Sequence, residues 1–136
     1  MHFSKTAEYA IRVLSYLHYN CEKSHSVNVL HKELSLPYKY LTKLMTELVK
    51  QGLVQASRGR DGGFSLAKDS SDILLSDILE AIGEPLESER CILGFEKCNA
   101  LNPCALHNNW VQPKEMIETM LSISLDSLVH GKSTKL

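Results

Sequence analysis

The chain has 136 residues, of which 43% are apolar and 23% charged. These values are typical of a soluble globular protein with one domain, or with a small domain and a helical extension. No apolar run approaches the roughly 20 residues that span a bilayer, which excludes an integral membrane protein. The N-terminus lacks the features of a secretory signal, so we expect a cytoplasmic protein. No catalytic triad order, phosphate-binding glycine loop or paired-carboxylate pocket indicates an enzyme.

The formal net charge of −1 conceals an asymmetry between the two halves of the chain. Residues 1–68 carry ten Lys and Arg against five Asp and Glu, whereas residues 69–136 carry five against eleven. A basic first half predicts a module that binds a polyanion and is joined to a part with another role.

Three helices are predicted in the first half. Ser4 is a good N-cap, and apolar residues at helical spacing predict a helix from there to residue 19. A short helix over residues 27–34 follows. Pro37 suits the first turn of a third helix, which runs to about residue 51 and is stopped by a glycine.

A β-hairpin is predicted directly after the third helix. Leu53 begins a short strand, Phe64 and Leu66 belong to a second, and the turn between them contains three glycines that can adopt positive φ. The tip of this hairpin carries Arg58 and Arg60. Helix, short helix, turn, helix and hairpin is the order of a winged helix-turn-helix.

The second half is predicted to contain a helix capped by Ser76, then a loop, then a long helix over residues 109–129 with Pro113 in its first turn. The expected fold is therefore mainly α with a small β-hairpin. Its parts are a winged helix-turn-helix DNA-binding domain over 1–83, a cysteine-rich loop over 84–108, and a C-terminal helix and tail over 109–136.

The second helix of a helix-turn-helix enters the major groove, where its N-terminal residues meet base edges. Residues 37–60 contain five basic residues and one acidic residue. Arginines at a hairpin tip suit the minor groove, whose negative potential attracts them. The predicted DNA contacts are Tyr38, Lys39, Tyr40, Thr42, Lys43, Lys50, Arg58 and Arg60.

Three of the four cysteines lie within residues 91–104, which in a cytosolic protein favours a metal or redox site over structural disulfides. Six residues separate Cys91 from Cys98, five separate Cys98 from Cys104, and two separate Cys104 from His107. Zinc with three thiolates and His107 is chemically reasonable, although these gaps exceed those of a zinc knuckle. A thiol switch is a second interpretation, and an iron–sulfur cluster, whose ligands span several irons, is a third. Cys21 is interpreted as an incidental thiol.

The chain resembles the winged-helix iron–sulfur transcription regulators of the IscR, NsrR and RsrR type. The matching stretches cover nearly the whole chain: FSKTAEYAIRVLSYL, LPYKYLTKLMTELVKQGLV, SRGRDGGFSLAK, ILLSDILEAIGEP, the three-cysteine segment through His107, and the last helix. An arginine–glycine hairpin tip joined to three spaced cysteines is a specific combination.

This resemblance implies a DNA-binding transcriptional regulator, expected to be a repressor, which recognises a palindromic operator as a homodimer built on its C-terminal helix. A [2Fe–2S] or [4Fe–4S] cluster held by Cys91, Cys98 and Cys104 would sense redox conditions, nitric oxide or iron status. His107 matches the fourth ligand of the IscR-like pattern. Glu8 of the partner subunit matches an NsrR-like ligand, and the RsrR-like pattern adds a histidine near His31.

The dimer contacts expected on the last helix are Trp110, Ile117, Leu121 and Leu128. The alternative function is a cluster-free winged-helix regulator that uses a cysteine thiol switch or a zinc site.

Overall fold

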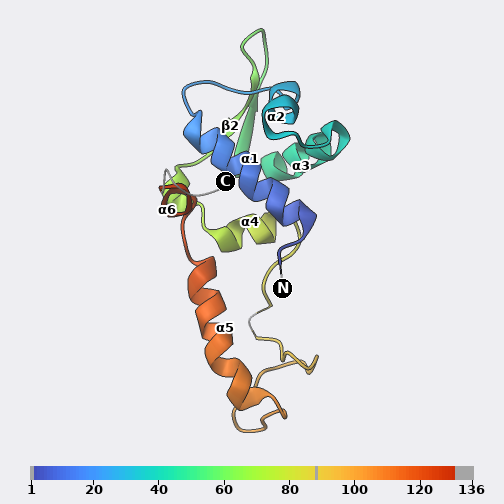
Figure 1. Cartoon of the computed structure of the whole chain (residues 1–136), viewed down its shortest axis with the longest axis vertical. Helices are drawn as coiled ribbons and strands as arrows, with labels where there is room; N and C mark the ends of the chain where they lie inside the picture. Colours follow the sequence, from blue (N-terminus) through green and yellow to red (C-terminus); the bar gives the residue numbers. More distant parts are fainter. Residues whose placement is uncertain (1, 88, 131–136) are drawn as a thin grey trace.

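The computed structural model describes residues 2–87 and 89–130 (Figure 1). It is mostly helical and contains one two-stranded antiparallel sheet, which confirms the predicted fold class. No helix in these two ranges is long and apolar enough to cross a membrane. In chain order the elements are α1 (Lys5–Tyr19), α2 (Val27–Leu34), α3 (Tyr38–Lys50), β1 (Val54–Ser57), β2 (Gly63–Leu66), the 3₁₀ helix η1 (Ser70–Asp72), α4 (Leu75–Ala81), α5 (His107–Leu121) and α6 (Leu125–Val129).

Helix α1 lies at the centre of the core and packs against α2, α4, α6 and β2. Ser4 caps it as predicted, since its hydroxyl accepts a hydrogen bond from the Ala7 N–H at 3.1 Å. The apolar positions of α1 and α3 recur at helical spacing, so each helix buries one face and leaves the other to solvent. The fully buried side chains include Leu14, Leu41, Met45 and Leu48. This core holds α3 with its polar face outward.

The hairpin is anchored to the loop before α2. Val54 pairs with Leu66 and Ser57 with Gly63, and outside this ladder His25 exchanges two backbone hydrogen bonds with Phe64, of 2.9 and 2.8 Å. Gly63 has φ +148°, and a Cβ there would lie 2.5 Å from the His25 carbonyl carbon. The close approach of the two backbones therefore requires glycine at this position.

Gly63→Ala is expected to lower the free energy of unfolding by about 2 kcal/mol or more, because the methyl group collides with backbone and the positive φ is strained. Gly59→Ala is the matched control: Gly59 also has positive φ, +107°, but its Cβ would enter open space. Urea denaturation of the full chain should show the larger loss for Gly63→Ala. Equal midpoints for the two variants would contradict this role of Gly63.

Two features of the second half differ from the predictions. Ser76 does not cap α4; Leu74 holds the N-cap position, where the Asp77 carboxylate accepts a hydrogen bond from its N–H at 2.8 Å. The helix predicted over 109–129 is two helices, because the chain breaks at residues 122–124. Pro113 lies inside α5, beyond its first turn.

Tertiary pairing explains the break between α5 and α6. The Leu75 N–H donates to the Ile123 carbonyl at 2.9 Å, and the Leu125 N–H donates to the Ile73 carbonyl at 2.7 Å. Ser124 then caps α6, which packs against α1 and η1 and buries Leu125 and Val129. The C-terminal part of the predicted long helix thus belongs to the core of the unit formed by α1–α4 and the hairpin. The tail over 131–136 lies outside the described residues.

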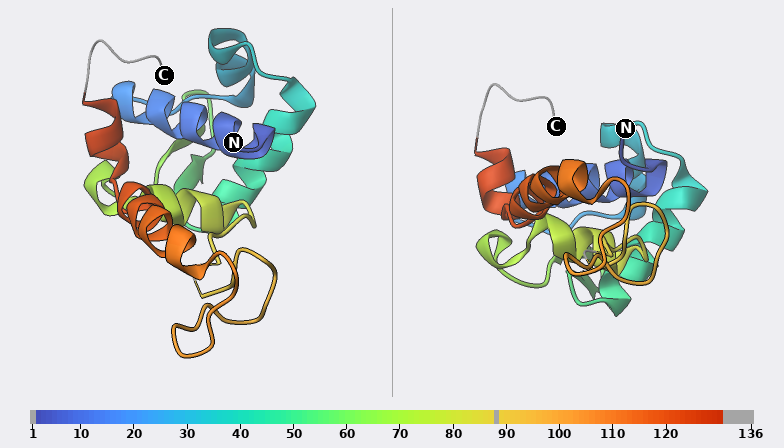
Figure 2. Two further views of the ribbon diagram at one scale, coloured as in Figure 1. Left: turned by 60° about the horizontal axis from the view of Figure 1, so that its bottom comes forward. Right: turned by 90° about the horizontal axis from the view of Figure 1, so that it is seen from below.

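Helix α5 projects from this unit, and the segment that contains the three cysteines lies at its far end (Figures 1 and 2). The hairpin occupies the opposite end of the molecule (Figure 1). The two surfaces singled out from the sequence are therefore well separated within one subunit.

Candidate DNA-binding surface and cysteine site

The turn between α2 and α3 is fixed by contacts that the sequence did not reveal. Ser35 ends α2 with φ +54°, in the left-handed region. The Arg12 guanidinium donates to the Leu34 carbonyl at 2.9 Å, and His31 Nδ1 donates to the Leu36 carbonyl at 2.6 Å. These bonds satisfy carbonyls at the end of α2 and set the direction in which α3 leaves. Neither Arg12 nor the orientation of His31 is signalled by spacing alone.

The exposed face of α3 carries five of the residues predicted to contact DNA. Tyr38 is half exposed and meets the His31 ring edge-on at 5.9 Å between centroids. Tyr40 is partly exposed, but its hydroxyl is hydrogen-bonded to the Thr6 hydroxyl of α1. The other three, Lys39, Thr42 and Lys43, face solvent. Lys50 is also exposed, at the C-terminal end of α3.

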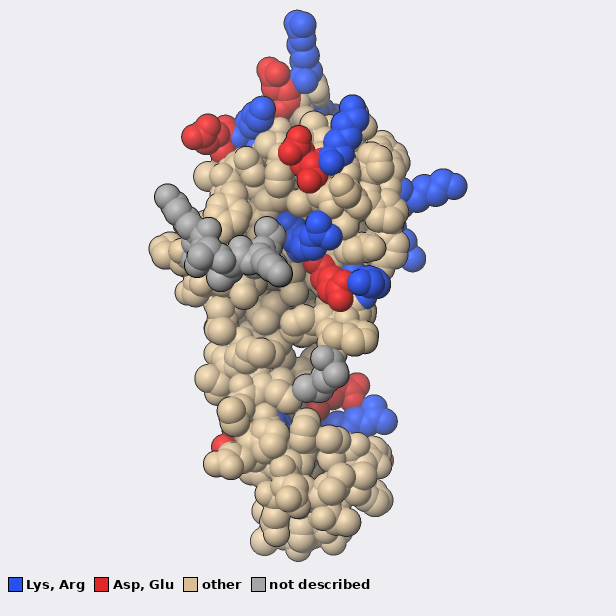
Figure 3. All heavy atoms as spheres, in the orientation of Figure 1, with Lys and Arg blue, Asp and Glu red and all other residues tan. Residues whose placement is uncertain are grey.

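The tip of the hairpin presents Arg58 and Arg60, both exposed and without an ion pair among the described residues. On the face shown in Figure 3 most Lys and Arg side chains lie over the end of the molecule that carries the hairpin and α3. The surface that a DNA duplex would meet is therefore the more basic end of the protein.

The cysteine segment is folded by its own backbone hydrogen bonds. The Gly94 N–H donates to the Cys91 carbonyl at 2.8 Å and the Cys91 N–H donates to the Phe95 carbonyl at 3.1 Å, which closes a tight turn. The Cys98 N–H donates to the Glu89 carbonyl at 2.8 Å. The His107 N–H donates to the Cys104 carbonyl at 3.0 Å, so the last two candidate ligands join the segment to α5.

These bonds bring the three cysteines and His107 around one hollow of about 360 Å³. Cys91 is buried at 5% exposure, and its thiol lies close enough to that of Cys104 for each to shift the pKa of the other. Cys98 Sγ lies 3.5 Å from His107 Nδ1. Glu8 is not among the residues that line this hollow in its own subunit; its carboxylate pairs with Lys5 Nζ at 2.7 Å.

The two paired thiols differ in acidity. The Leu93 backbone N–H, directed at the Cys91 sulfur, lowers the pKa of Cys91, and the Cys104 thiol adds a further hydrogen bond. The pKa of Cys104 is raised, first because it donates to Cys91 and also because it is partly desolvated. Cys91 is therefore the more readily deprotonated of the pair, and the thiolate is the form that binds metal.

The donor set suits a cluster better than a single ion. Within residues 2–87 and 89–130, no three His, Cys, Asp or Glu side chains converge closely enough to hold one metal ion. A single zinc ion requires four donors about one point, whereas the ligands of a cluster reach different irons and stand further apart. Three soft thiolates around one hollow match that second requirement.

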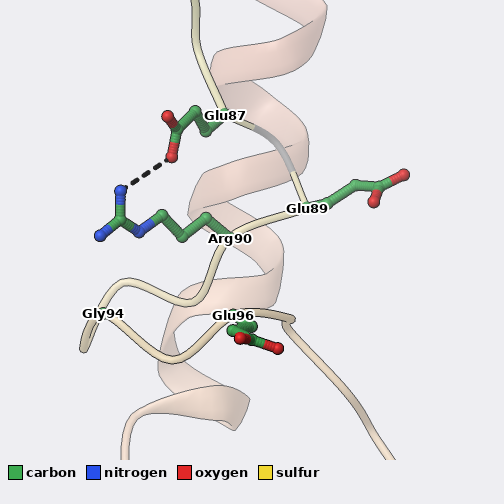
Figure 4. Close-up of a pocket in the computed structure, with 5 residues that line it drawn as sticks. All are labelled: Glu87, Glu89, Arg90, Gly94 and Glu96. Atoms are coloured by element: carbon green, nitrogen blue, oxygen red, sulfur yellow. Dashed lines mark hydrogen bonds and ion pairs between the residues drawn. The ribbon is translucent and has the colours of Figure 1, made fainter.

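A second hollow, of about 410 Å³, lies beside the cysteine segment and is lined mainly by charged side chains (Figure 4). Glu87 and Arg90 pair across it at 3.0 Å, and Glu89 points away from that pair. Glu87 and Arg90 are both well exposed. This acidic surface sits at the end of the molecule away from the hairpin and would repel a phosphate backbone.

The predicted dimer residues fall into two groups. Trp110 and Ile117 line an apolar hollow of about 550 Å³ between α5 and the N-terminus, together with the half-exposed Met120. Leu121 is only 4% exposed, and Leu128 packs against the core of its own subunit. Leu121 therefore has little surface left to give to a partner, whereas Leu128, like Ile117, is only partly buried.

A family model described as "Iron-dependent Transcriptional regulator" matches residues 3–131. The chain belongs to the Rrf2 family. It is 39% identical over 120 residues to a candidate HTH-type transcriptional regulator of Aquifex aeolicus, an alignment that covers 87% of this chain and 83% of that protein. It is 37% identical over 94 residues to the HTH-type transcriptional regulator IscR of Photorhabdus laumondii, covering 68% of this chain and 57% of IscR. The chain thus matches little more than half of the length of that IscR.

Solved structures of Rrf2-like regulators share the fold. CymR of B. subtilis, described as a global cysteine regulator, superposes with a TM-score of 0.79 at 21% identity, over 96% of this chain and 97% of CymR. IscR of T. potens gives 0.76 at 23% identity, over the whole of this chain and 93% of that one. These structures show that the chain has the winged-helix fold. The family model and the curated relatives show that it is a transcriptional regulator rather than an enzyme.

Proposed function

We propose that this Rrf2 protein is a homodimeric repressor whose affinity for a palindromic operator is controlled by an iron–sulfur cluster held by Cys91, Cys98, Cys104 and His107. The observation that carries the proposal is the convergence of three thiols and an imidazole on one hollow, in a protein with an exposed basic recognition surface. The resemblance to IscR supports the nature of the cofactor.

On the operator, α3 lies in the major groove with Tyr38 and Thr42 toward the bases. Lys39, Lys43 and Lys50 neutralise phosphates, which contributes affinity without sequence choice. Arg58 and Arg60 enter the adjacent minor groove. In the dimer the two copies of α3 meet major grooves about 34 Å apart, so each half-site is read once.

The dimer forms through α5, whose main packing partner among the helices of the described residues is α4. The apolar contact is supplied by Trp110, Met116, Ile117 and Met120. Met116 is 69% exposed in the single subunit. Burying this face in a partner removes apolar surface from water and orders the end of α5 that carries His107.

When bound, the cluster supplies a group whose charge and integrity change with oxidants, nitric oxide or iron supply. Cys91, Cys98 and Cys104 would hold the segment to the cluster, and His107 would hold the first turn of α5. Loss of these four attachments frees the segment from the dimer helix. A coupling of about 1–3 kcal/mol between this site and the DNA surface suffices for a useful switch.

A second function is favoured by the proximity of Cys91 and Cys104, which line the same hollow and shift each other's pKa. In cluster-free protein a peroxide could oxidise the two thiols to a disulfide; the thiols lose two electrons and two protons and the peroxide is reduced to water. The segment would then respond to oxidants directly. A zinc site is less well supported because no three donors among the described residues lie close enough together to share one ion.

Purification under anaerobic conditions separates these functions. We expect a coloured protein with bound iron and acid-labile sulfide. A colourless protein with one zinc per subunit would favour the zinc site. A metal-free protein that refuses iron and sulfide but forms the Cys91–Cys104 disulfide on peroxide treatment would favour the thiol switch.

The salt dependence of operator binding tests the phosphate contacts. Lys39→Ala and Lys43→Ala should each reduce the slope of log affinity against log salt by about 1.8 for the dimer, because each removes one phosphate contact per subunit. Lys114→Ala, on α5, should leave the slope unchanged. If both α3 variants kept the wild-type slope, these lysines would not contact DNA phosphates.

A further inference from the structure

The first turns of α1 contact both functional regions of the chain. Ser4, the N-cap residue, donates its hydroxyl to the Glu84 carboxylate, whose two oxygens lie at 2.7 and 2.6 Å. Glu84 stands where α4 ends, since its N–H donates to the Leu79 carbonyl at 2.9 Å. The cysteine segment begins at this residue. The N-terminal end of α1 is therefore hydrogen-bonded to the first residue of that segment.

Two residues further along, α1 is attached to the recognition helix. The hydroxyls of Thr6 and Tyr40 are hydrogen-bonded, and the Tyr9 ring packs edge-on against the Tyr40 ring with 5.3 Å between centroids. Helix α3 otherwise packs mainly on α2 and β1. Beside the Thr6–Tyr40 contact a hollow of about 310 Å³ lies between α1 and α3, so side chains do not fill the space there. Tyr40 thus bridges two elements that are not tightly packed at this point.

From these contacts we infer that Tyr40 is a positioning residue for DNA recognition, and that the turn Ser4–Tyr9 links the cysteine segment to α3 through the Ser4–Glu84 and Thr6–Tyr40 hydrogen bonds. The inference rests on the proposed control of DNA binding by the cysteine site. Its chemistry is simple: a displacement of Glu84 shifts the capped end of α1, and Thr6 carries that shift to the helix that reads bases. Tyr40 acts through Thr6 and not through a base edge.

The Thr6–Tyr40 bond is tested by a double-mutant cycle. Thr6→Val and Tyr40→Phe remove only the two hydroxyls. Affinity is measured for a duplex that the wild-type protein selects from a random-sequence library. We expect each single variant to bind about three- to tenfold more weakly, and the double variant to bind no more weakly than either. Thr119→Val removes a hydroxyl that, among the described residues, donates to the Glu115 carbonyl of its own helix; it is the matched control and should bind like wild type.

A direct contact of Tyr40 with DNA gives a different pattern. In that case Tyr40→Phe weakens binding while Thr6→Val does not, or the two losses add in the double variant. Either result overturns the positioning role.

The Ser4–Glu84 bond is tested by the ratio of operator affinities between cluster-loaded and cluster-free protein. Glu84→Ala leaves the Ser4 cap intact but removes the link, and should bring this ratio at least about threefold closer to one. Glu84→Gln retains a side-chain oxygen that accepts a hydrogen bond from the Ser4 hydroxyl, and should restore the wild-type ratio. Glu80→Ala removes the same charge one turn earlier in α4, from a side chain that makes no hydrogen bond or ion pair with the described residues, and should have no effect.

The outcomes separate this link from the proposed function. If wild type shows a ratio well above or below one and Glu84→Ala retains it, the link is wrong and control by the cysteine site stands. If wild type itself shows a ratio of one, control by the cysteine site is wrong, and the role of Glu84 with it. The Thr6–Tyr40 cycle gives its answer in either case.

Discussion

Cys91→Ala, Cys98→Ala and Cys104→Ala are each expected to bind at least about tenfold less iron than wild type after anaerobic reconstitution with iron and sulfide. Each thiolate holds a different part of the cluster, and even supporting residues of such sites contribute tenfold or more to metal affinity. Visible absorption, iron and sulfide content measure the effect. Operator affinity in these variants should equal that of cluster-free wild type, whatever iron and sulfide are added.

Cys21→Ala is the matched control, because Cys21 is an exposed thiol in the loop after α1 and does not line the hollow. It should reconstitute like wild type. Wild-type absorption that survives in all three segment variants would remove the cysteines from the ligand set. Loss of iron in Cys21→Ala would show that the set is incomplete.

Replacing Arg58 and Arg60 together by alanine is expected to weaken operator binding by about 2 kcal/mol or more, which is roughly thirtyfold. Both guanidinium groups stand free at the hairpin tip, so no ion pair within the described residues has to break before they bind DNA. The measurement is a titration of the selected operator duplex at fixed salt. The unfolding midpoint should not change, because neither side chain contributes to the core.

Arg90→Ala is the control for the double variant. It also removes an arginine, one per subunit, but at the opposite end of the molecule from the hairpin. Measured in cluster-free protein, it should leave operator affinity within twofold of wild type. Wild-type affinity in the Arg58 and Arg60 double variant would place the hairpin tip outside the DNA interface. Equal losses in both variants would mean that overall charge, and not the wing, drives binding.

Local sequence patterns predicted the first half of the fold well. Helices α1, α2 and α3 begin and end within about one residue of the positions expected from capping residues and apolar spacing. The hairpin was recognised because glycine-rich turns of this length specify it locally. In these elements local preference and tertiary packing favour the same conformation.

The second half was less predictable because tertiary contacts decide it. The apolar positions between residues 110 and 128 suit one long helix, yet backbone pairing of residues 123–125 with 73–75 interrupts it. Ser76 has the side chain of a cap, but the bond from Leu74 to Asp77 starts α4 earlier. Neither pairing leaves a trace in the local sequence, since the partners are about fifty residues apart or are not typical capping residues.

For the functional regions, the sequence indicated which residues are involved but not how their side chains are arranged. The spacing of Cys91, Cys98, Cys104 and His107 identified the residues that line one hollow, and their role as ligands stays a prediction. The pairing of Cys91 with Cys104, and of Cys98 with His107, depends on turns that no spacing rule specifies. The attachment of Tyr40 to α1 was equally invisible, because a tyrosine on a recognition helix is first interpreted as a base contact.

One measurement tests the central claim most directly: Mössbauer spectroscopy of anaerobically reconstituted wild-type protein, with an operator titration on the same sample before and after the cluster is removed. We predict the spectrum of a [2Fe–2S] or [4Fe–4S] cluster and a change in operator affinity of about five- to 150-fold. Protein that takes up no cluster iron, or that binds the operator equally well with and without its cluster, would contradict the claim.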